Sequence, residues 1–144
     1  MANSMFVPIE RHPSGIDEIK NSLSIVFSEF NQPVPTIRQD VEASSNVNLD
    51  SGFLIIEGLG EGHHCWASIS RCGSELTGLP NCELMVDIKT RGSWFFAGIV
   101  AYAFCRSAGT VIFNDACELD GRETYTADSI KKVLHKWTDL KKHE

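Results

Sequence analysis

The sequence lacks the long apolar segments that membrane proteins and exported proteins carry. Its longest uninterrupted apolar stretch runs from Trp94 to Cys105, well short of the roughly 20 residues that a helix needs to cross a bilayer. Near the N-terminus, no basic segment is followed by an apolar run of signal-peptide length. We therefore expect a cytoplasmic protein with no membrane partner.

Cysteines in zinc-binding or disulfide spacing are also missing. The five cysteines cannot all pair within one chain, and they lack the close paired spacing of zinc ligands. His63 and His64 precede Cys65, but alternation along a strand would send His64 to the face opposite the other two. We therefore predict reduced thiols, two exposed imidazoles and a buried Cys65, with no metal and no other cofactor.

Positive charge is scarce as well. The formal net charge is −6, whereas proteins that bind nucleic acid or anionic membranes rely on an excess of lysine and arginine. Residues 31–62 hold five carboxylates and one arginine, while residues 126–144 hold five lysines and form a mildly basic end. This charge argues against nucleic acid as a partner and favours a basic protein.

What the sequence does contain is typical of a globular protein. Of its 144 residues, 42% are apolar and 22% are charged, and a chain of this length buries about two-thirds of the surface that it exposes when unfolded. No repeat, low-complexity tract or shift in composition marks a boundary. We therefore expect a single domain over residues 1–144.

Apolar residues that recur in steps of three and four predict three helices. They span residues 15–30 with Ser14 as N-cap, residues 94–107 with Ser93 as N-cap, and a C-terminal segment that follows Thr126. The middle helix is apolar all round, so it must be covered on most sides. It is expected to be the central packing element.

Alternating or short apolar runs between turn residues predict strands. They lie at residues 37–41, 53–56, 65–69, 83–89 and 110–113. The expected fold class is α+β, with a mainly antiparallel sheet of about four to five strands packed against the central apolar helix. The other two helices lie at the N- and C-terminal ends of the chain.

Two junctions contain residues that could bind phosphate. The glycine-spaced connector 58–62 is followed by a strand rather than a helix, and Glu57 and Glu61 would repel an anion, so a hairpin turn is favoured. In residues 89–94, an arginine and free helix N–H groups could meet an anion. A simple turn with a Ser93 cap accounts for that segment more economically.

No catalytic residue is predicted. Cys105 lies in the apolar helix, where burial raises a thiol pKa, and Cys117 is surrounded by carboxylates that disfavour a thiolate. A calcium loop with Gly121 at its sixth position would place Ala116 and Ala127 where carboxylates are required. Neither nucleophilic catalysis nor calcium binding is therefore expected.

Carboxylates gather at two loops, which are the candidate partner-binding sites. The loop before the last helix has two interpretations, a solvated connection or an acidic docking patch, and charge alone does not separate them. The candidate residues are Glu57, Glu61, Asp115, Glu118, Asp120 and Glu123.

Residues 83–134 contain, in order, a strand, Arg91-Gly92, the aromatic-rich helix from Trp94-Phe95-Phe96, a strand ending in Asn114-Asp115, an acidic loop and a helix introduced by Tyr125-Thr126. In this order of elements, about a third of the chain resembles the small α+β immunity proteins that are encoded beside bacterial polymorphic toxins. The resemblance implies stoichiometric inhibition of one toxin domain, without chemistry. Basic clefts of toxins would suit an acidic inhibitor.

Two other classes stay open beside this binding protein. A small enzyme would need polar groups that converge in a pocket, which the sequence does not reveal. A ligand-binding regulatory domain would need a cavity beside the 94–107 helix.

Overall fold

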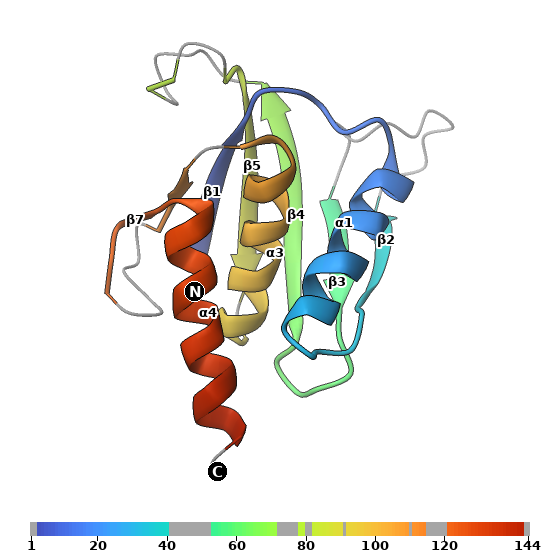
Figure 1. Ribbon diagram of the computed structural model, residues 1–144. Helices are drawn as coiled ribbons and strands as arrows, with labels where there is room; N and C mark the ends of the chain where they lie inside the picture. Colours follow the sequence, from blue (N-terminus) through green and yellow to red (C-terminus); the bar gives the residue numbers. More distant parts are fainter. Residues whose placement is uncertain are drawn as a thin grey trace.

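The computed structural model describes residues 3–40, 53–71, 78–79, 82–90, 92–109, 111–114 and 121–142. Its strands are β1 (Asn3–Ile9), β2 (Thr36–Asp40), β3 (Phe53–Glu57), β4 (His64–Arg71), β5 (Leu84–Thr90), β6 (Ile112–Phe113) and β7 (Thr124–Tyr125). Its helices are α1 (Ile16–Glu29), α3 (Trp94–Ala108) and α4 (Ala127–Lys142). The chain therefore has the expected α+β class (Figure 1).

The seven strands form one sheet in the order β2-β3-β4-β5-β1-β6-β7, and neighbouring strands are antiparallel. The predicted count of four to five strands is wrong, because β1 and β7 add to the five segments expected. β1 lies between β5 and β6 although it contains Pro8, whose missing N–H normally argues against an interior strand. β7 has two residues, too few for alternation to show.

The three helices lie side by side on one face of the sheet, in front of it in Figure 1. α3 is in the middle of this layer, where it contacts α1, α4 and the strands beneath it. Its residues from Phe95 to Cys105 are all buried, so its predicted role as central packing element is confirmed. Within the described residues, no helix is both long enough and apolar enough to cross a membrane.

Alternation along the strands decides which side chains enter the core. In β5, Leu84, Val86 and Ile88 are buried in the cluster that includes the α3 side chains, as the sequence predicts. The same rule buries Ala67 and Ile69 in β4. Every second residue of these strands therefore faces away from the helices.

Side-chain caps determine where α3 and α4 begin. Ser93 Oγ accepts a hydrogen bond from the Phe96 N–H with an N–O distance of 3.2 Å. Thr126 Oγ1 accepts one from the Ser129 N–H, also at 3.2 Å. Each bond satisfies an N–H group that has no partner inside the helix. Both predicted N-caps are confirmed.

The predicted Ser14 cap of α1 is wrong. The N-cap position is Gly15, which makes no side-chain capping bond. Ser14 instead donates its backbone N–H to Glu18 Oε2 at 2.6 Å. The same carboxylate accepts from Arg11 at 2.7 Å. The first turn of α1 is thus held by Glu18 reaching back towards the incoming chain.

Gly109 ends α3 for a reason that helix-capping rules do not give. Its φ of −114° is extended rather than left-handed. A Cβ at this position would lie 2.8 Å from the Pro8 carbonyl oxygen and 3.1 Å from a methyl carbon of Val7. Glycine is therefore required because β1 passes close to the end of α3.

Candidate functional site: the open face of the sheet

The sheet has a second face, opposite the helices, that is built from the alternate residues of its strands. In β4 the side chains on this face include His64, Trp66 and Ser68, and in β5 they include Asp87 and Lys89. All five residues are partly exposed, in contrast to their buried neighbours. We call this surface the open face.

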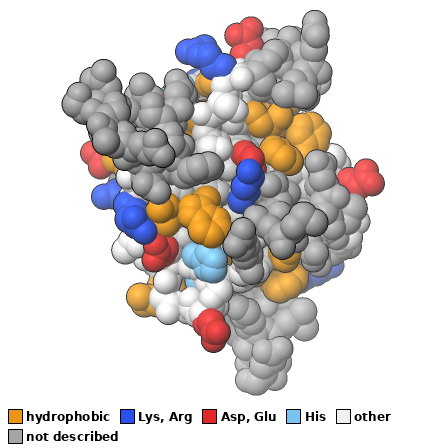
Figure 2. Space-filling view, turned by 180° about the vertical axis from the view of Figure 1, so that it is seen from behind, with side chains coloured by type: hydrophobic (Ala, Val, Ile, Leu, Met, Phe, Trp, Pro, Cys, Tyr) orange, Lys and Arg blue, Asp and Glu red, His pale blue; other side chains and the backbone are white. Residues whose placement is uncertain are grey.

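Strand register places Trp66 in the middle of a row across the open face. Ile55 of β3 lies opposite Trp66, and Arg38 of β2 lies opposite Ile55. On the other side, Lys89 of β5 lies opposite Trp66. Figure 2 shows hydrophobic side chains gathered near the middle of this view, with a histidine beside them and charges of both signs around them. The row joins an aromatic centre to cationic ends.

A hollow of about 280 Å³ lies between this row and the β3–β4 turn. The rings of His64 and Trp66 form one part of its wall, with centroids 5.5 Å apart and an edge-to-face angle of 75°. Arg38 and Glu57 form another part, with Nη2 and Oε1 3.3 Å apart. The hollow thus offers aromatic surface beside an ion pair.

The structure separates the predicted site residues. Glu57 lines the hollow and pairs with Arg38, and Glu61 is exposed in the adjacent turn. Glu123 is exposed just before β7, at the opposite edge of the sheet, so it does not join them. The other predicted residues lie outside the described residues: Asp115, Glu118 and Asp120.

The glycine-spaced connector closes the β3–β4 hairpin, as predicted. Gly58 N–H donates to the His63 carbonyl oxygen at 2.7 Å, and His63 N–H donates to the Gly60 carbonyl oxygen at 3.1 Å. The His63 ring stacks on Phe96 of α3, with centroids 5.4 Å apart. A Cβ at Gly58 would lie 2.9 Å from the Phe96 ring, and one at Gly60 2.8 Å from the His63 ring. These glycines serve close packing.

The hairpin also docks onto the start of α3. The Gly62 carbonyl oxygen accepts the Ser93 N–H at 2.8 Å. A Cβ at Gly92 would clash with that oxygen, so only glycine fits there. Because Ser93 N–H and Phe96 N–H already have partners, the geometry favours the turn-and-cap interpretation over an anion site. Arg91 lies outside the described residues.

Histidine and cysteine side chains near the hairpin differ from the prediction in one respect. His63 and His64 are half-buried rather than exposed, because one packs on Phe96 and the other against Trp66. Cys65 is fully buried, as predicted. Among the described residues, no three side chains of His, Cys, Asp or Glu lie together in a way that could hold a metal ion.

Burial also controls the two thiols beside the core. It raises the pKa of Cys65, and it raises the pKa of Cys105 to about 11. Because the thiolate is the nucleophilic form, these raised pKa values favour the protonated thiol at both positions at neutral pH. Cys72 and Cys117 lie outside the described residues.

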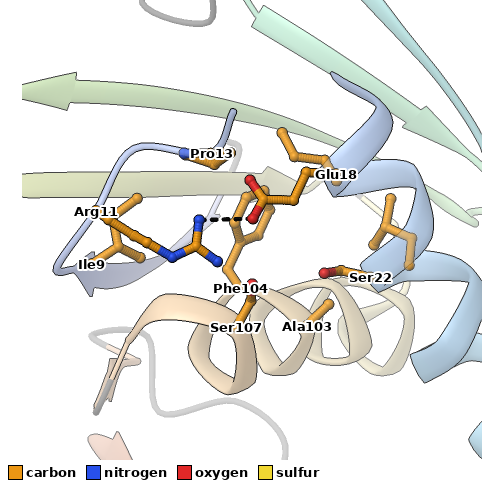
Figure 3. Close-up of a pocket in the computed structure, with 10 residues that line it drawn as sticks. Ile9, Arg11, Pro13, Glu18, Ser22, Ala103, Phe104 and Ser107 are labelled. Carbon is orange, nitrogen blue, oxygen red and sulfur yellow. Dashed lines mark ion pairs between the residues drawn. The ribbon is translucent and has the colours of Figure 1, made fainter. Parts of the chain in front are cut away.

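A ligand-binding domain would need a cavity beside α3, and the structure has a small hollow there (Figure 3). Ile9, Leu23 and Phe104 contribute to its apolar lining, and the Arg11–Glu18 ion pair lies beside it. Its enclosed volume is about 20 Å³, enough for about one water. Small-molecule sites usually measure roughly 300–1,000 Å³, so this hollow does not provide one.

The aromatic centre of the open face was missed at the level of sequence. The strand predicted at residues 65–69 contains Trp66, but the prediction does not assign its side chain to a face of the sheet. Alternation contained the necessary information, because a buried Cys65 and a buried Ala67 place Trp66 on the other side of β4. Its neighbours Ile55 and Lys89 follow only from the strand register.

Comparison with known proteins gives no further guidance. No protein-family model, no curated protein and no solved structure matches the chain. The functional argument therefore rests on the geometry of the open face and on the resemblance in residues 83–134.

Proposed function

We propose that this protein is a non-catalytic binding protein, an immunity protein that binds and neutralises a bacterial toxin domain through the open face. The resemblance in residues 83–134 suggests the class, and the open face suggests the surface. The single observation that carries the surface is the position of Trp66, at the centre of a row with Arg38 and Lys89 at its flanks.

Trp66 fits the role of an interface anchor. Tryptophan and arginine are enriched among the residues that dominate binding energy, and these residues gather near the middle of an interface. A flat sheet face presents such an anchor rigidly, because its backbone is fixed by neighbouring strands on both sides. Binding therefore loses little conformational entropy at this point.

The carboxylates at the hairpin suit a basic partner. Glu61 is exposed, and Glu57 lies within the hollow beside Trp66. An overall charge of −6 would steer a cationic surface towards this end of the open face and would raise the association rate. Glu57 already pairs with Arg38, so Glu61 has the freer carboxylate for the first encounter.

Partner capture from the native strain, followed by mass spectrometry, identifies the protein to be tested. The captured domain is then expressed alone in a bacterial host and together with this chain. We expect growth to stop in the first case and to recover in the second. A captured domain that is harmless when expressed alone would contradict the immunity function and leave only a binding protein.

Rate constants for the purified pair then test the surface. Trp66→Ala should raise Kd by about 30-fold or more, mainly through a faster off-rate, because a central anchor contributes about 2 kcal/mol or more. The pair Glu57→Lys and Glu61→Lys should slow association, and its effect should shrink once salt shortens the Debye length below about 8 Å.

A matched control separates the open face from a general change in the protein. Ile25→Ala removes an exposed apolar side chain from α1, in the helical layer on the other side of the sheet. It should leave both rate constants unchanged. Unchanged rates in a folded Trp66→Ala variant would overturn the open face as the binding surface.

A further inference from the structure

The lysines of the mildly basic segment 126–144 lie on α4. Ile130 and Leu134 are fully buried in the cluster that α3 centres, so they fix which side of α4 faces inward. Lys132 and Lys136 are exposed and lie one helical turn apart. Two cations are thus presented next to each other on the outer side of the helix.

A hollow of about 630 Å³ lies beside these two lysines. Val133 contributes an almost fully buried apolar surface to it. Arg122, from the segment before β7, brings a third cationic residue to the same lining. Asp128 is the one carboxylate among the described residues that line it. Among the described residues of this lining, three cationic residues therefore outnumber one carboxylate at neutral pH.

The two lysines differ from their neighbour in sequence. Lys131 pairs with Glu29 of α1, with Nζ and Oε1 2.8 Å apart. Within the part of the chain that the structure describes, neither Lys132 nor Lys136 makes an ion pair. Like charges four residues apart destabilise a helix. An anionic partner bound between them would remove this repulsion.

The chemistry of the partner follows from the extent of the cationic surface. Nucleic acid is held by many phosphate contacts along an extended basic stripe. Three cations around one hollow match a few carboxylates instead. The aliphatic stems of Lys132 and Lys136, together with the exposed edge of Val133, add a place for one apolar side chain.

We propose that this hollow beside α4, lined by Lys132, Lys136, Arg122 and Val133, docks a short acidic segment of a protein that carries an apolar residue. The site shares no residue with the hollow on the open face. It does not depend on the proposed immunity function, and the two surfaces can fail separately.

Fluorescence anisotropy with a labelled octapeptide of glutamates around one central leucine tests the proposal. We expect binding at about 50 mM NaCl that weakens at about 300 mM NaCl. Lys132→Glu with Lys136→Glu should weaken it by about tenfold or more, since two attractive contacts become repulsive. The matched control, Lys20→Glu with Arg71→Glu, changes net charge equally on exposed residues outside the hollow. It should alter Kd by less than about twofold.

Four outcomes would overturn the proposal. The first is no binding of the peptide at concentrations up to about 1 mM, and the second is an unchanged Kd for the peptide in the α4 double variant. The third is a loss of affinity in the control double variant equal to that in the α4 double variant. The fourth is that a single-stranded RNA binds more tightly than the peptide and that the α4 double variant abolishes RNA binding as well as peptide binding. Circular dichroism verifies folding. If the charge-reversed variant does not fold, Lys132→Gln with Lys136→Gln replaces it, with an expected loss of about threefold.

Discussion

The two faces of the sheet come from alternate residues of the same strands, yet they have opposite character. In β3, Ile56 is fully buried beneath the helices, whereas Ile55 is half-buried on the open face. In β4, Ala67 is fully buried and Trp66 is not. The covered face is apolar throughout these strands, while the open face mixes aromatic rings with both signs of charge. Fully buried and partly exposed side chains are therefore separated by a single step along the chain.

The sharpest test of this separation uses two adjacent isoleucines. Ile56→Ala should lower the free energy of unfolding by about 2–5 kcal/mol, because it leaves a cavity in a close-packed core. Ile55→Ala, the matched control, should cost about 1 kcal/mol or less, since solvent and neighbouring side chains can fill the space. Urea unfolding at neutral pH measures both. Equal losses would show that the open face is as tightly packed as the covered one.

The β3–β4 hairpin, which borders the hollow on the open face, docks onto the start of α3 through the hydrogen bond from Ser93 N–H to the Gly62 carbonyl oxygen. Gly92→Ala should break this contact. The new methyl group would meet the Gly62 carbonyl oxygen, which is backbone and cannot move aside cheaply. We expect a loss of about 1–3 kcal/mol by thermal or urea unfolding. Gly15→Ala is the control, because a Cβ there meets nothing within 4 Å. Comparable losses in both variants would contradict the role of the close contact.

The open face should contain residues that are poor for stability, and Asp87 tests this. Its Oδ1 is buried without a hydrogen-bond partner, while Oδ2 lies 3.6 Å from Lys89 Nζ. Asp87→Thr removes the unsatisfied oxygen and adds a residue suited to strands, so unfolding should become harder by about 1 kcal/mol. The exposed pair with Lys89 offsets little of this. A loss of stability would show that the carboxylate is structural.

The smallest effect is expected at the edge of the helical layer. A hydrogen bond from the Ser14 backbone and the Arg11 guanidinium lower the pKa of Glu18. A carboxyl group whose pKa is lower in the folded state than in the unfolded state stabilises the fold at pH values above its unfolded pKa. This stabilisation is lost as the pH falls through its folded pKa. Glu18→Gln should therefore cost at most about 1 kcal/mol near pH 7 and nothing near pH 2. A loss that persists near pH 2 would point to packing rather than charge.

Much of the fold could be predicted because local rules agreed with tertiary packing. The all-apolar helix had to be central, Ser93 and Thr126 had to cap, and alternation in residues 83–89 predicted the buried side of what the structure shows as β5. β1 was missed because residues 5–9 form a short continuous apolar run that contains Pro8, so no alternation marks them as a strand. Its place between β5 and β6 comes from long-range pairing, which no local pattern encodes.

The candidate site was less predictable than the fold. Composition pointed to acidic loops, but Glu57 turned out to pair with Arg38, a contact across β2 and β3 that depends on register. Glu123 lies at the opposite edge of the sheet, which depends on strand order. Charge patterns in sequence identify which residues are available. Only the sheet topology decides which of them meet.

The contact of Gly62 with Gly92 also defines a sequence pattern by which distant relatives of this chain could be identified. Position 92 tolerates no side chain while the Gly62 carbonyl oxygen lies beside it, and this oxygen belongs to the backbone whatever residue stands at position 62. A Cβ at Gly60 would meet the His63 ring, and one at Gly58 would meet the Phe96 ring and the His63 Cβ. A distant relative whose strands have diverged beyond recognition should still show these spaced glycines, the histidine after them, and a lone glycine just before the apolar helix.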